Sequence, residues 1–83
     1  MNKLSVKGLA LAGGVLWSFY TLLIGLAAWL FNWGTGLVSV MASLYIGFSP
    51  TLAGSLIGAA WAFIDGVIGG AVIAWVYNKA IGT

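Results

Sequence analysis

Two long apolar runs, at residues 9–31 and 50–77, constrain this chain more than any other feature of its sequence. Each run exceeds the roughly 18 residues that mark a candidate transmembrane helix. Neither run has a polar face to turn toward water, and 63% of the 83 residues are hydrophobic. A chain this short also struggles to bury enough surface to fold alone in water. We therefore predict an all-α membrane protein rather than a soluble helical hairpin.

The predicted architecture is a single transmembrane hairpin over residues 1–83. The first transmembrane helix is expected at about residues 8–31, and it ends at the turn signals of the segment NWGTG, residues 32–36. The second is expected at about residues 50–78. Ser49 suits its N-cap position and Pro50 its first helical position.

The segment between the two runs, residues 37–48, is too apolar for an ordinary loop. Its large apolar residues recur at helical spacing, whereas Ser39, Ser43 and Gly47 fall on the other side. We predict a short interfacial helix whose apolar face turns toward the membrane. That face would consist of Leu37, Val40, Met41, Leu44, Tyr45 and Phe48.

The few charges predict how the hairpin lies in the membrane. Lys3 and Lys7 precede the first run, Lys79 follows the second, and no lysine or arginine lies between Lys7 and Lys79. The positive-inside rule then places both termini in the cytoplasm and the connecting loop outside. We expect the protein in the cytoplasmic (inner) membrane. Aromatic residues and Lys79 mark where the helices should cross the two membrane interfaces: Trp29 and Trp33 outside, Trp75, Tyr77 and Lys79 inside.

Small residues form a stripe along each helix, and such stripes let helices approach closely in a bilayer. In the second helix they recur at every fourth position, and one further glycine, Gly69, widens the stripe. In the first helix the spacing alternates between four and three, which is typical of a left-handed helix pair. The predicted packing residues are Gly54, Gly58, Ala62, Gly66, Gly69, Gly70 and Ala74 in the second helix, and Gly14, Ser18, Thr21, Gly25 and Ala28 in the first. This stripe packs either on the chain's own first helix alone or on other chains as well.

Asp65 is the only acidic residue, and it falls near the middle of the second run, within the face that carries the small stripe. Charging a carboxylate at that depth costs several kcal/mol, so three arrangements are reasonable. It is protonated and hydrogen-bonded to a neighbouring helix, with Thr21 and Ser18 as candidate partners. Alternatively it pairs with a cation of another protein, or it lines water. We favour hydrogen bonding between helices over proton or ion transport.

The sequence contains no cysteine, histidine, glutamate or arginine. Most general bases, metal ligands and phosphate-binding side chains are therefore missing, and we expect neither an enzyme nor a metal or cofactor site. Three lysines are too few for a nucleic-acid surface, so the expected partners are membrane lipid, further copies of the chain, or unlike subunits.

Several segments resemble a family of small two-helix membrane proteins commonly labelled phage holins. They are Trp33-Gly34-Thr35, residues 45–51 (YIGFSPT), residues 54–59 (GSLIGA), residues 61–66 (WAFIDG) and Gly69-Gly70. The resemblance covers most of the chain from residue 33 onward. It implies two spans with both ends inside, and self-assembly into membrane lesions that release a lytic enzyme.

Three functions remain open at this point. The first is holin-like self-assembly in the membrane. The second is a structural, accessory role in a larger respiratory or photosynthetic complex. The third, which resembles the chain only loosely, is a proton-carrying rotor subunit that uses Asp65 as its carrier.

Overall fold

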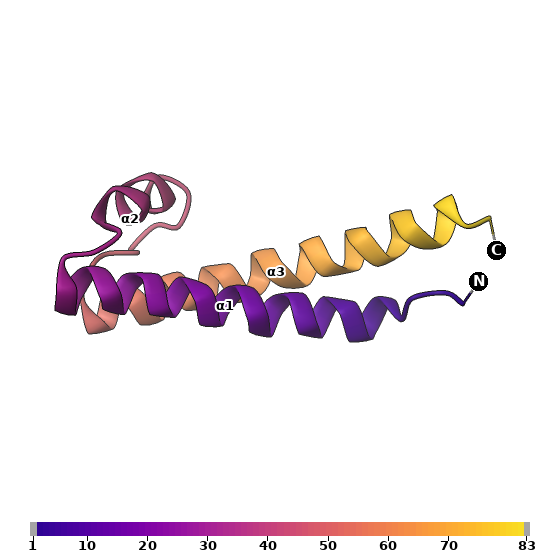
Figure 1. The fold of residues 1–83 in the computed structure, drawn as a ribbon, viewed down its shortest axis with the longest axis horizontal. Coiled ribbons are helices and arrows are strands. Elements are labelled where there is room, and N and C mark those ends of the chain that lie inside the picture. Colours follow the sequence, from indigo (N-terminus) through magenta and orange to yellow (C-terminus); the bar gives the residue numbers. More distant parts are fainter. Residues whose placement is uncertain (1, 83) are drawn as a thin grey trace.

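The computed structural model describes residues 2–82, and over that range the chain forms three α-helices and no strand. Helices α1 (Val6–Phe31) and α3 (Leu52–Ala80) lie side by side as a hairpin, and α2 (Thr35–Ala42) belongs to the segment that connects them (Figure 1). The molecule is a rod of 47 × 18 × 18 Å. Both chain ends lie at one end of the rod, and α2 lies at the other (Figure 1). The predicted helical hairpin is therefore confirmed.

Residues at its two ends set the length of α1. Ser5 is the N-cap, and its hydroxyl accepts a hydrogen bond of 3.0 Å from the amide of Gly8. Asn32 ends the helix in the left-handed conformation, with φ 52°, which asparagine tolerates better than most residues. The 26 residues between them span about 39 Å at the usual helical rise.

Helix α3 begins two residues later than predicted, because Thr51 and not Ser49 is its N-cap. Thr51 has an extended backbone, and its Oγ1 accepts a hydrogen bond of 2.9 Å from the amide of Gly54. The hydroxyl of Ser49 instead lies 3.0 Å from that of Thr51. Pro50 therefore precedes the helix rather than starting it. The helix ends at Ala80, two residues later than expected.

Helix α2 is shorter than the helix predicted over residues 37–48. It starts at Thr35, after Gly34 in the left-handed conformation (φ 77°), and ends at Ala42. Its one buried residue is Val38, whereas Leu37 and Val40, both predicted to face the membrane, are exposed on the surface of the molecule. Leu44, also expected there, is exposed and lies beyond the helix.

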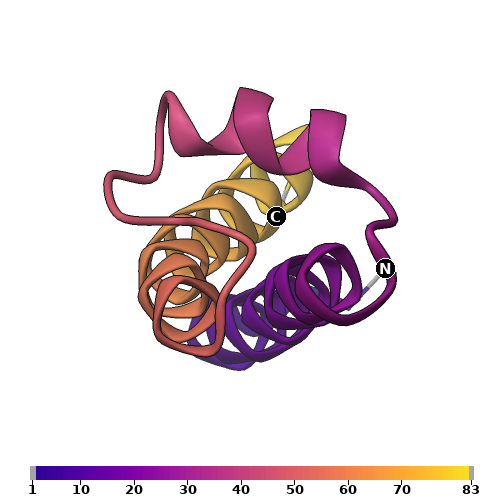
Figure 2. The same cartoon turned by 90° about the vertical axis from the view of Figure 1, so that its left-hand side faces the viewer.

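The connecting segment packs against one side of the hairpin rather than capping its end (Figure 2). Turns after α2 bring Tyr45 and Phe48 back onto the long helices, where both are buried. They form a small apolar cluster with Ala28, Val38 and Ala62. This cluster explains why the helix stops at Ala42: a continuous helix would not return both aromatic rings to the hairpin.

Within residues 2–82, α1 and α3 are the two helices long and apolar enough to cross a membrane by length and composition. Only about a fifth of each span's most apolar window is buried inside the molecule, 22% for α1 and 17% for α3. Most residues of these two apolar windows are therefore not buried within the molecule.

Candidate functional site

Helices α1 and α3 touch through glycine backbones at the middle of the hairpin. A methyl group added at Gly13 would lie 2.5 Å from the carbonyl oxygen of Gly66, and one added at Gly66 would collide with the carbonyl oxygen of Gly13. A methyl group at Gly70 would collide in the same way with the carbonyl oxygen of Leu9. Because backbone atoms cannot swing aside, these positions accept no side chain at this helix separation.

Toward the connecting segment, different groups cover the same stripe of α3. The ring of Phe48 fills the space beside Gly58, and the side chain of Ser49 fills that beside Gly54. On α1, a methyl group at Gly25 would collide with the hydroxyl of Ser55. The stripe therefore packs on α1 along one half and largely on the connecting segment along the other.

Eleven of the twelve predicted packing residues lie at, or next to, contacts between different parts of the same chain. Gly66 and Ser18 are partly exposed there. The buried members are Gly14, Thr21, Gly25, Ala28, Gly54, Gly58, Ala62, Gly70 and Ala74. The twelfth residue, Gly69, is also partly exposed, and it differs from the other glycines of the set because a methyl group added there would meet nothing within 4 Å.

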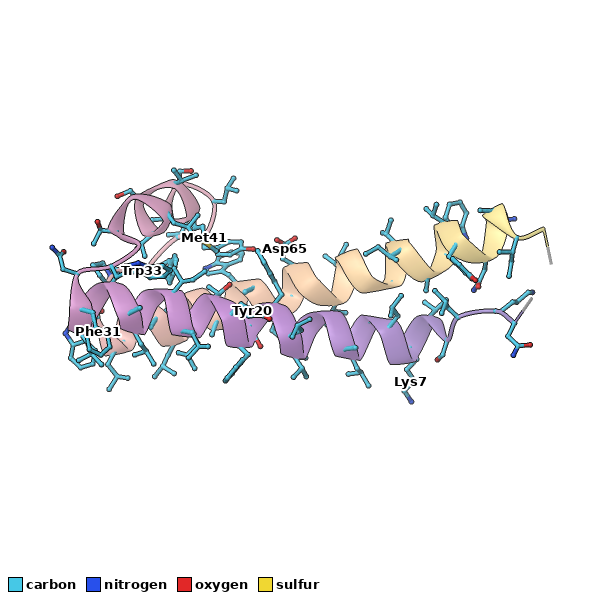
Figure 3. All side chains as sticks on the ribbon, in the orientation of Figure 1. Lys7, Tyr20, Phe31, Trp33, Met41 and Asp65 are labelled. Carbon is cyan, nitrogen blue, oxygen red and sulfur yellow. The ribbon has the colours of Figure 1, made fainter. Side chains whose placement is uncertain are left out.

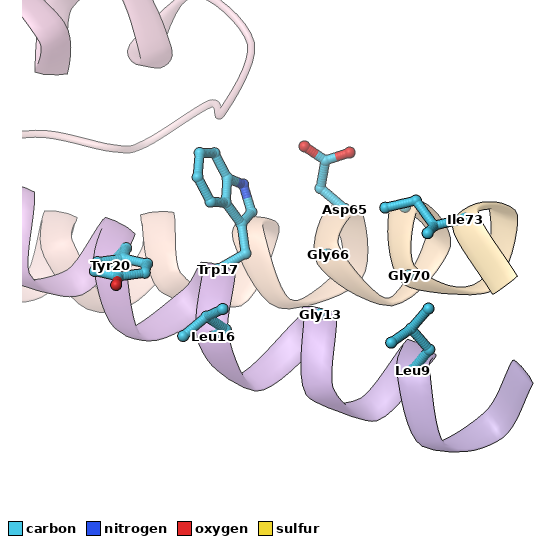
Figure 4. A pocket seen from close by; sticks show the side chains of 10 residues that line it. Leu9, Gly13, Leu16, Trp17, Tyr20, Asp65, Gly66, Gly70 and Ile73 are labelled. Atoms are coloured by element: carbon cyan, nitrogen blue, oxygen red, sulfur yellow. The ribbon is translucent and has the colours of Figure 1, made fainter. Parts of the chain in front are cut away.

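Gly69 lies in an open groove that runs between α1 and α3 near the middle of the rod. The groove has a volume of about 600 Å³ and is open along one side. Its floor contains Gly13, Gly66 and Gly70, which contact one another across the interface. Leu9, Leu16 and Ile73 add apolar walls, and the remaining lining residues are Trp17, Tyr20 and Asp65 (Figure 4).

Asp65 is held at one edge of this groove by a chain of hydrogen bonds from three separate parts of the sequence. The hydroxyl of Tyr45 donates to Asp65 Oδ2 at 2.6 Å, and Trp17 Nε1 donates to the same hydroxyl at 2.9 Å. Trp17 and Asp65 extend to the same side of the helix pair (Figure 4). These two hydrogen bonds therefore join α1, the connecting segment and α3 at one point.

These contacts correct the expectation that Thr21 or Ser18 would bond Asp65. Ser18 donates its hydroxyl hydrogen bond to the carbonyl of Val15, one turn back on its own helix, at 3.0 Å. Thr21 is fully buried, and its hydroxyl has no hydrogen-bond partner within residues 2–82. Asp65 is exposed at the edge of the small stripe rather than within it, so it turns away from both hydroxyls.

Tyr45 has a pKa above the ordinary value of 10.0, chiefly because the phenol is buried. The hydrogen bond to Asp65 and the negative charge of that carboxylate raise the pKa further, and the bond from Trp17 opposes this in part. The phenol therefore stays protonated at physiological pH and acts as the donor to Asp65.

A second network closes the opposite end of the hairpin. The amide of Leu4 donates to Asn78 Oδ1 at 2.8 Å, and Asn78 Nδ2 donates back to the carbonyl of Leu4 at 3.0 Å. Lys79 Nζ lies 5.8 Å from the ring centre of Trp75, within cation–π range. The N-terminal segment and the end of α3 are therefore fixed together.

The predicted interface anchors lie toward the two ends of the rod. Phe31 and Trp33 lie at the end with the connecting segment, and Asp65 lies near the middle (Figure 3). Trp29, Trp33 and Trp75 are largely exposed, and Tyr77 is half-buried.

Sequence reasoning missed Tyr45 as the partner of Asp65, because nothing local links residues 20 positions apart across a loop. It also missed Gly13, although Gly13-Gly14 doubles the small position in α1 and offered a signal.

Within residues 2–82, no group of three or more metal-ligating side chains forms. No protein-family model, curated protein or solved structure matches the chain.

Proposed function

We propose that this chain is a non-enzymatic integral membrane hairpin that self-assembles in the bilayer in a holin-like manner. One observation carries the membrane part of the proposal: the residues turned inward between the helices are small, and the large apolar residues point outward. Ala62 and Ala74 are fully buried, whereas Phe19, Ile68 and Trp75 each expose more than half of their surface.

This arrangement is the reverse of a core formed by the hydrophobic effect in water. Soluble proteins bury large apolar side chains and seldom expose extended apolar patches. In lipid, by contrast, large apolar residues gain nothing by moving from the lipid tails into the interior of the protein. Helices there associate through small residues that permit close packing. The inward glycines and outward leucines, isoleucines and tryptophans fit a lipid environment.

The distribution of charge and aromatic residues supports an orientation. Lys3, Lys7 and Lys79 lie toward the end of the rod where the chain ends meet, and Trp29 and Trp33 lie toward the other end. The length of 47 Å matches a bilayer of about 40–45 Å including its headgroups. We place the chain ends in the cytoplasm, and α2 in the outer interface of the inner membrane.

Orientation is tested by labelling single cysteines, for which the cysteine-free chain is well suited. Asn2→Cys and Ser43→Cys alter exposed positions at opposite ends. In intact cells a membrane-impermeant maleimide should label Ser43→Cys and spare Asn2→Cys until the membrane is broken. Labelling of both, or of Asn2→Cys alone, would overturn the orientation.

Self-assembly has to use outward faces, because the small stripe is largely occupied within the hairpin. Variants such as Gly58→Ile or Gly66→Ile would disrupt the hairpin itself and cannot report on oligomers alone. We place the contact between copies on the outward ridge of α3 that contains Ile64 and Ile68, both more than half exposed. The resemblance of residues 33–70 to holins supports association between like chains.

Cysteine crosslinking distinguishes contact between copies from contact within a chain. Ile68→Cys should form crosslinked dimers in membranes that contain the protein at a low ratio to lipid. The matched control is Val67→Cys, one residue away, because the Val67 side chain faces Gly14 of α1. Absence of dimers from Ile68→Cys, or equal crosslinking of both variants, would refute this interface. Co-purification with larger, unlike chains would instead favour an accessory subunit.

A further inference from the structure

The groove beside Gly69 has the size and chemistry of a small-molecule site. Its volume of about 600 Å³ lies within the range of roughly 300–1,000 Å³ that is usual for ligand pockets. Apart from Asp65, the Trp17 indole nitrogen and the Tyr20 hydroxyl, its lining side chains are apolar. Such a lining accepts an apolar molecule and offers a single acidic side chain, that of Asp65, to orient it.

That group is a carboxylate with one oxygen left free. Tyr45 occupies Oδ2, and Oδ1 receives no hydrogen bond from residues 2–82. Nor does Asp65 form an ion pair over this range. Lys7 and Lys79, the lysines nearest to it in sequence, are 58 and 14 residues away at the far end of the hairpin. An ionised carboxylate at membrane depth is costly unless a cation lies beside it, and a counter-charge for Asp65 would have to come from outside the chain.

A second copy of the chain cannot provide that counter-charge. Every copy lacks lysine, arginine and histidine between Lys7 and Lys79, and so has no cation at the depth of Asp65. The aromatic residues in the groove add a further preference. The rings of Trp17 and Tyr20 line it on the α1 side, and aromatic faces attract cations, most strongly where water is excluded.

We propose that this groove binds a lipophilic cation, a positive charge carried on apolar or aryl groups, with Asp65 as its counter-ion and Trp17 and Tyr20 as aromatic walls. The charge would lie at Asp65 Oδ1, and the apolar groups would fill the space over Gly69. Tyr45 acts as a positioning residue, because its hydroxyl fixes both Asp65 and Trp17. The proposal rests on the membrane location proposed above but not on self-assembly.

Binding is tested with the purified full chain in uncharged detergent micelles. Tetraphenylphosphonium is the probe, and tetraphenylborate, which has a similar shape and the opposite charge, is its control. Isothermal titration should give saturable binding of the phosphonium at one per chain, and only non-saturable partitioning of the borate. Equal behaviour of the two ions, or no saturable phosphonium binding, would overturn the proposal. Because detergent-solubilised chains are titrated, failure here leaves the crosslinking test of self-assembly unaffected.

Two variants locate the site. Asp65→Asn keeps an amide oxygen that can accept from Tyr45 but removes the charge, and it should weaken phosphonium binding at least tenfold. Gly69→Leu places a side chain in the groove, where its Cβ meets no atom within 4 Å, and it should abolish binding while the circular dichroism spectrum stays helical and the melting temperature does not fall. Trp29→Phe, outside the groove, should bind as the unmodified chain does.

Two results would count against the site even if the phosphonium binds. If Asp65→Asn binds as tightly as the unmodified chain, the cation is not held by this carboxylate. If Gly69→Leu converts an oligomer to a monomer, a second copy of the chain occupies the groove.

Discussion

The closest test of how the two long helices pack compares one added methyl group at two neighbouring glycines of α3. Gly66→Ala places a Cβ 2.8 Å from the carbonyl carbon of Gly13 and 2.9 Å from the Cα of Gly14. Gly69→Ala, less than one turn away, places its Cβ in open space. Both changes gain the same helix propensity, about 1 kcal/mol. The difference between the two variants therefore isolates the cost of pushing α1 and α3 apart.

That cost is about 1–3 kcal/mol, the usual penalty for inserting a methylene-sized group into a packed interior. Since backbone atoms of α1 receive the clash, we expect the upper part of this range. Relative to the unmodified chain, Gly69→Ala should be stabilised by about 1 kcal/mol, and Gly66→Ala destabilised by about 1–2 kcal/mol.

The assay is unfolding by sodium dodecyl sulfate in mixed micelles, followed by the near-ultraviolet circular dichroism of the tryptophans. Far-ultraviolet signals would be insensitive, because the separated helices remain helical in detergent. A Gly66→Ala variant as stable as Gly69→Ala would refute the close backbone contact, and with it the intramolecular use of the small stripe.

Four further predictions concern polar groups. Thr21→Val replaces a buried hydroxyl that lacks a partner by a methyl group of similar size, and should stabilise the hairpin by about 1–2 kcal/mol in the same detergent titration; destabilisation would mean that the hydroxyl is bonded. Tyr45→Phe removes the bonds to Asp65 and Trp17, and should cost about 1–3 kcal/mol and speed amide exchange in residues 43–50. Because folding raises the pKa of Tyr45, its stabilisation is complete below pH 10 and declines as the pH rises through the folded value; an alkaline midpoint that persists in Tyr45→Phe would contradict this. Asn78→Ala frees the backbone of Leu4, and should speed exchange of the Leu4 amide with little change in global stability; unaltered exchange would refute the clamp.

The long elements of the fold could be predicted because their signals are local and repeated. Apolar runs above 18 residues fix the two long helices, and Asn32 and the glycines after it mark the first turn. The predicted N-cap of α3, Ser49, is wrong: Thr51 is a good N-cap as well, and it is Thr51 that accepts the hydrogen bond from Gly54.

The connecting segment shows where local reasoning ends. Helical spacing over residues 37–48 predicted one continuous apolar face, but the chain turns after Ala42 so that Tyr45 and Phe48 reach α1 and α3. Phe48 fills the space beside Gly58, and Tyr45 donates a hydrogen bond to the carboxylate of Asp65. Both partners lie in α3, outside the connecting segment. Neither is visible in the spacing of the segment itself.

The small stripe illustrates a similar limit at the candidate site. Its spacing predicted close approach, yet spacing alone cannot say what approaches. Gly66, Gly69 and Gly70 read alike in sequence, but Gly66 and Gly70 meet backbone atoms of α1 and Gly69 faces an open groove. The difference depends on how α1 crosses α3, which a single sequence does not encode at any one position.

The proposed function depends most directly on what the chain assembles with. Extraction from its own membrane in a mild detergent, followed by native mass spectrometry of the intact particle, measures this in one step. Self-assembly predicts masses that are multiples of a single 8.6 kDa chain. A particle that contains one or two copies bound to larger, unlike chains, or a monomer alone, would contradict it.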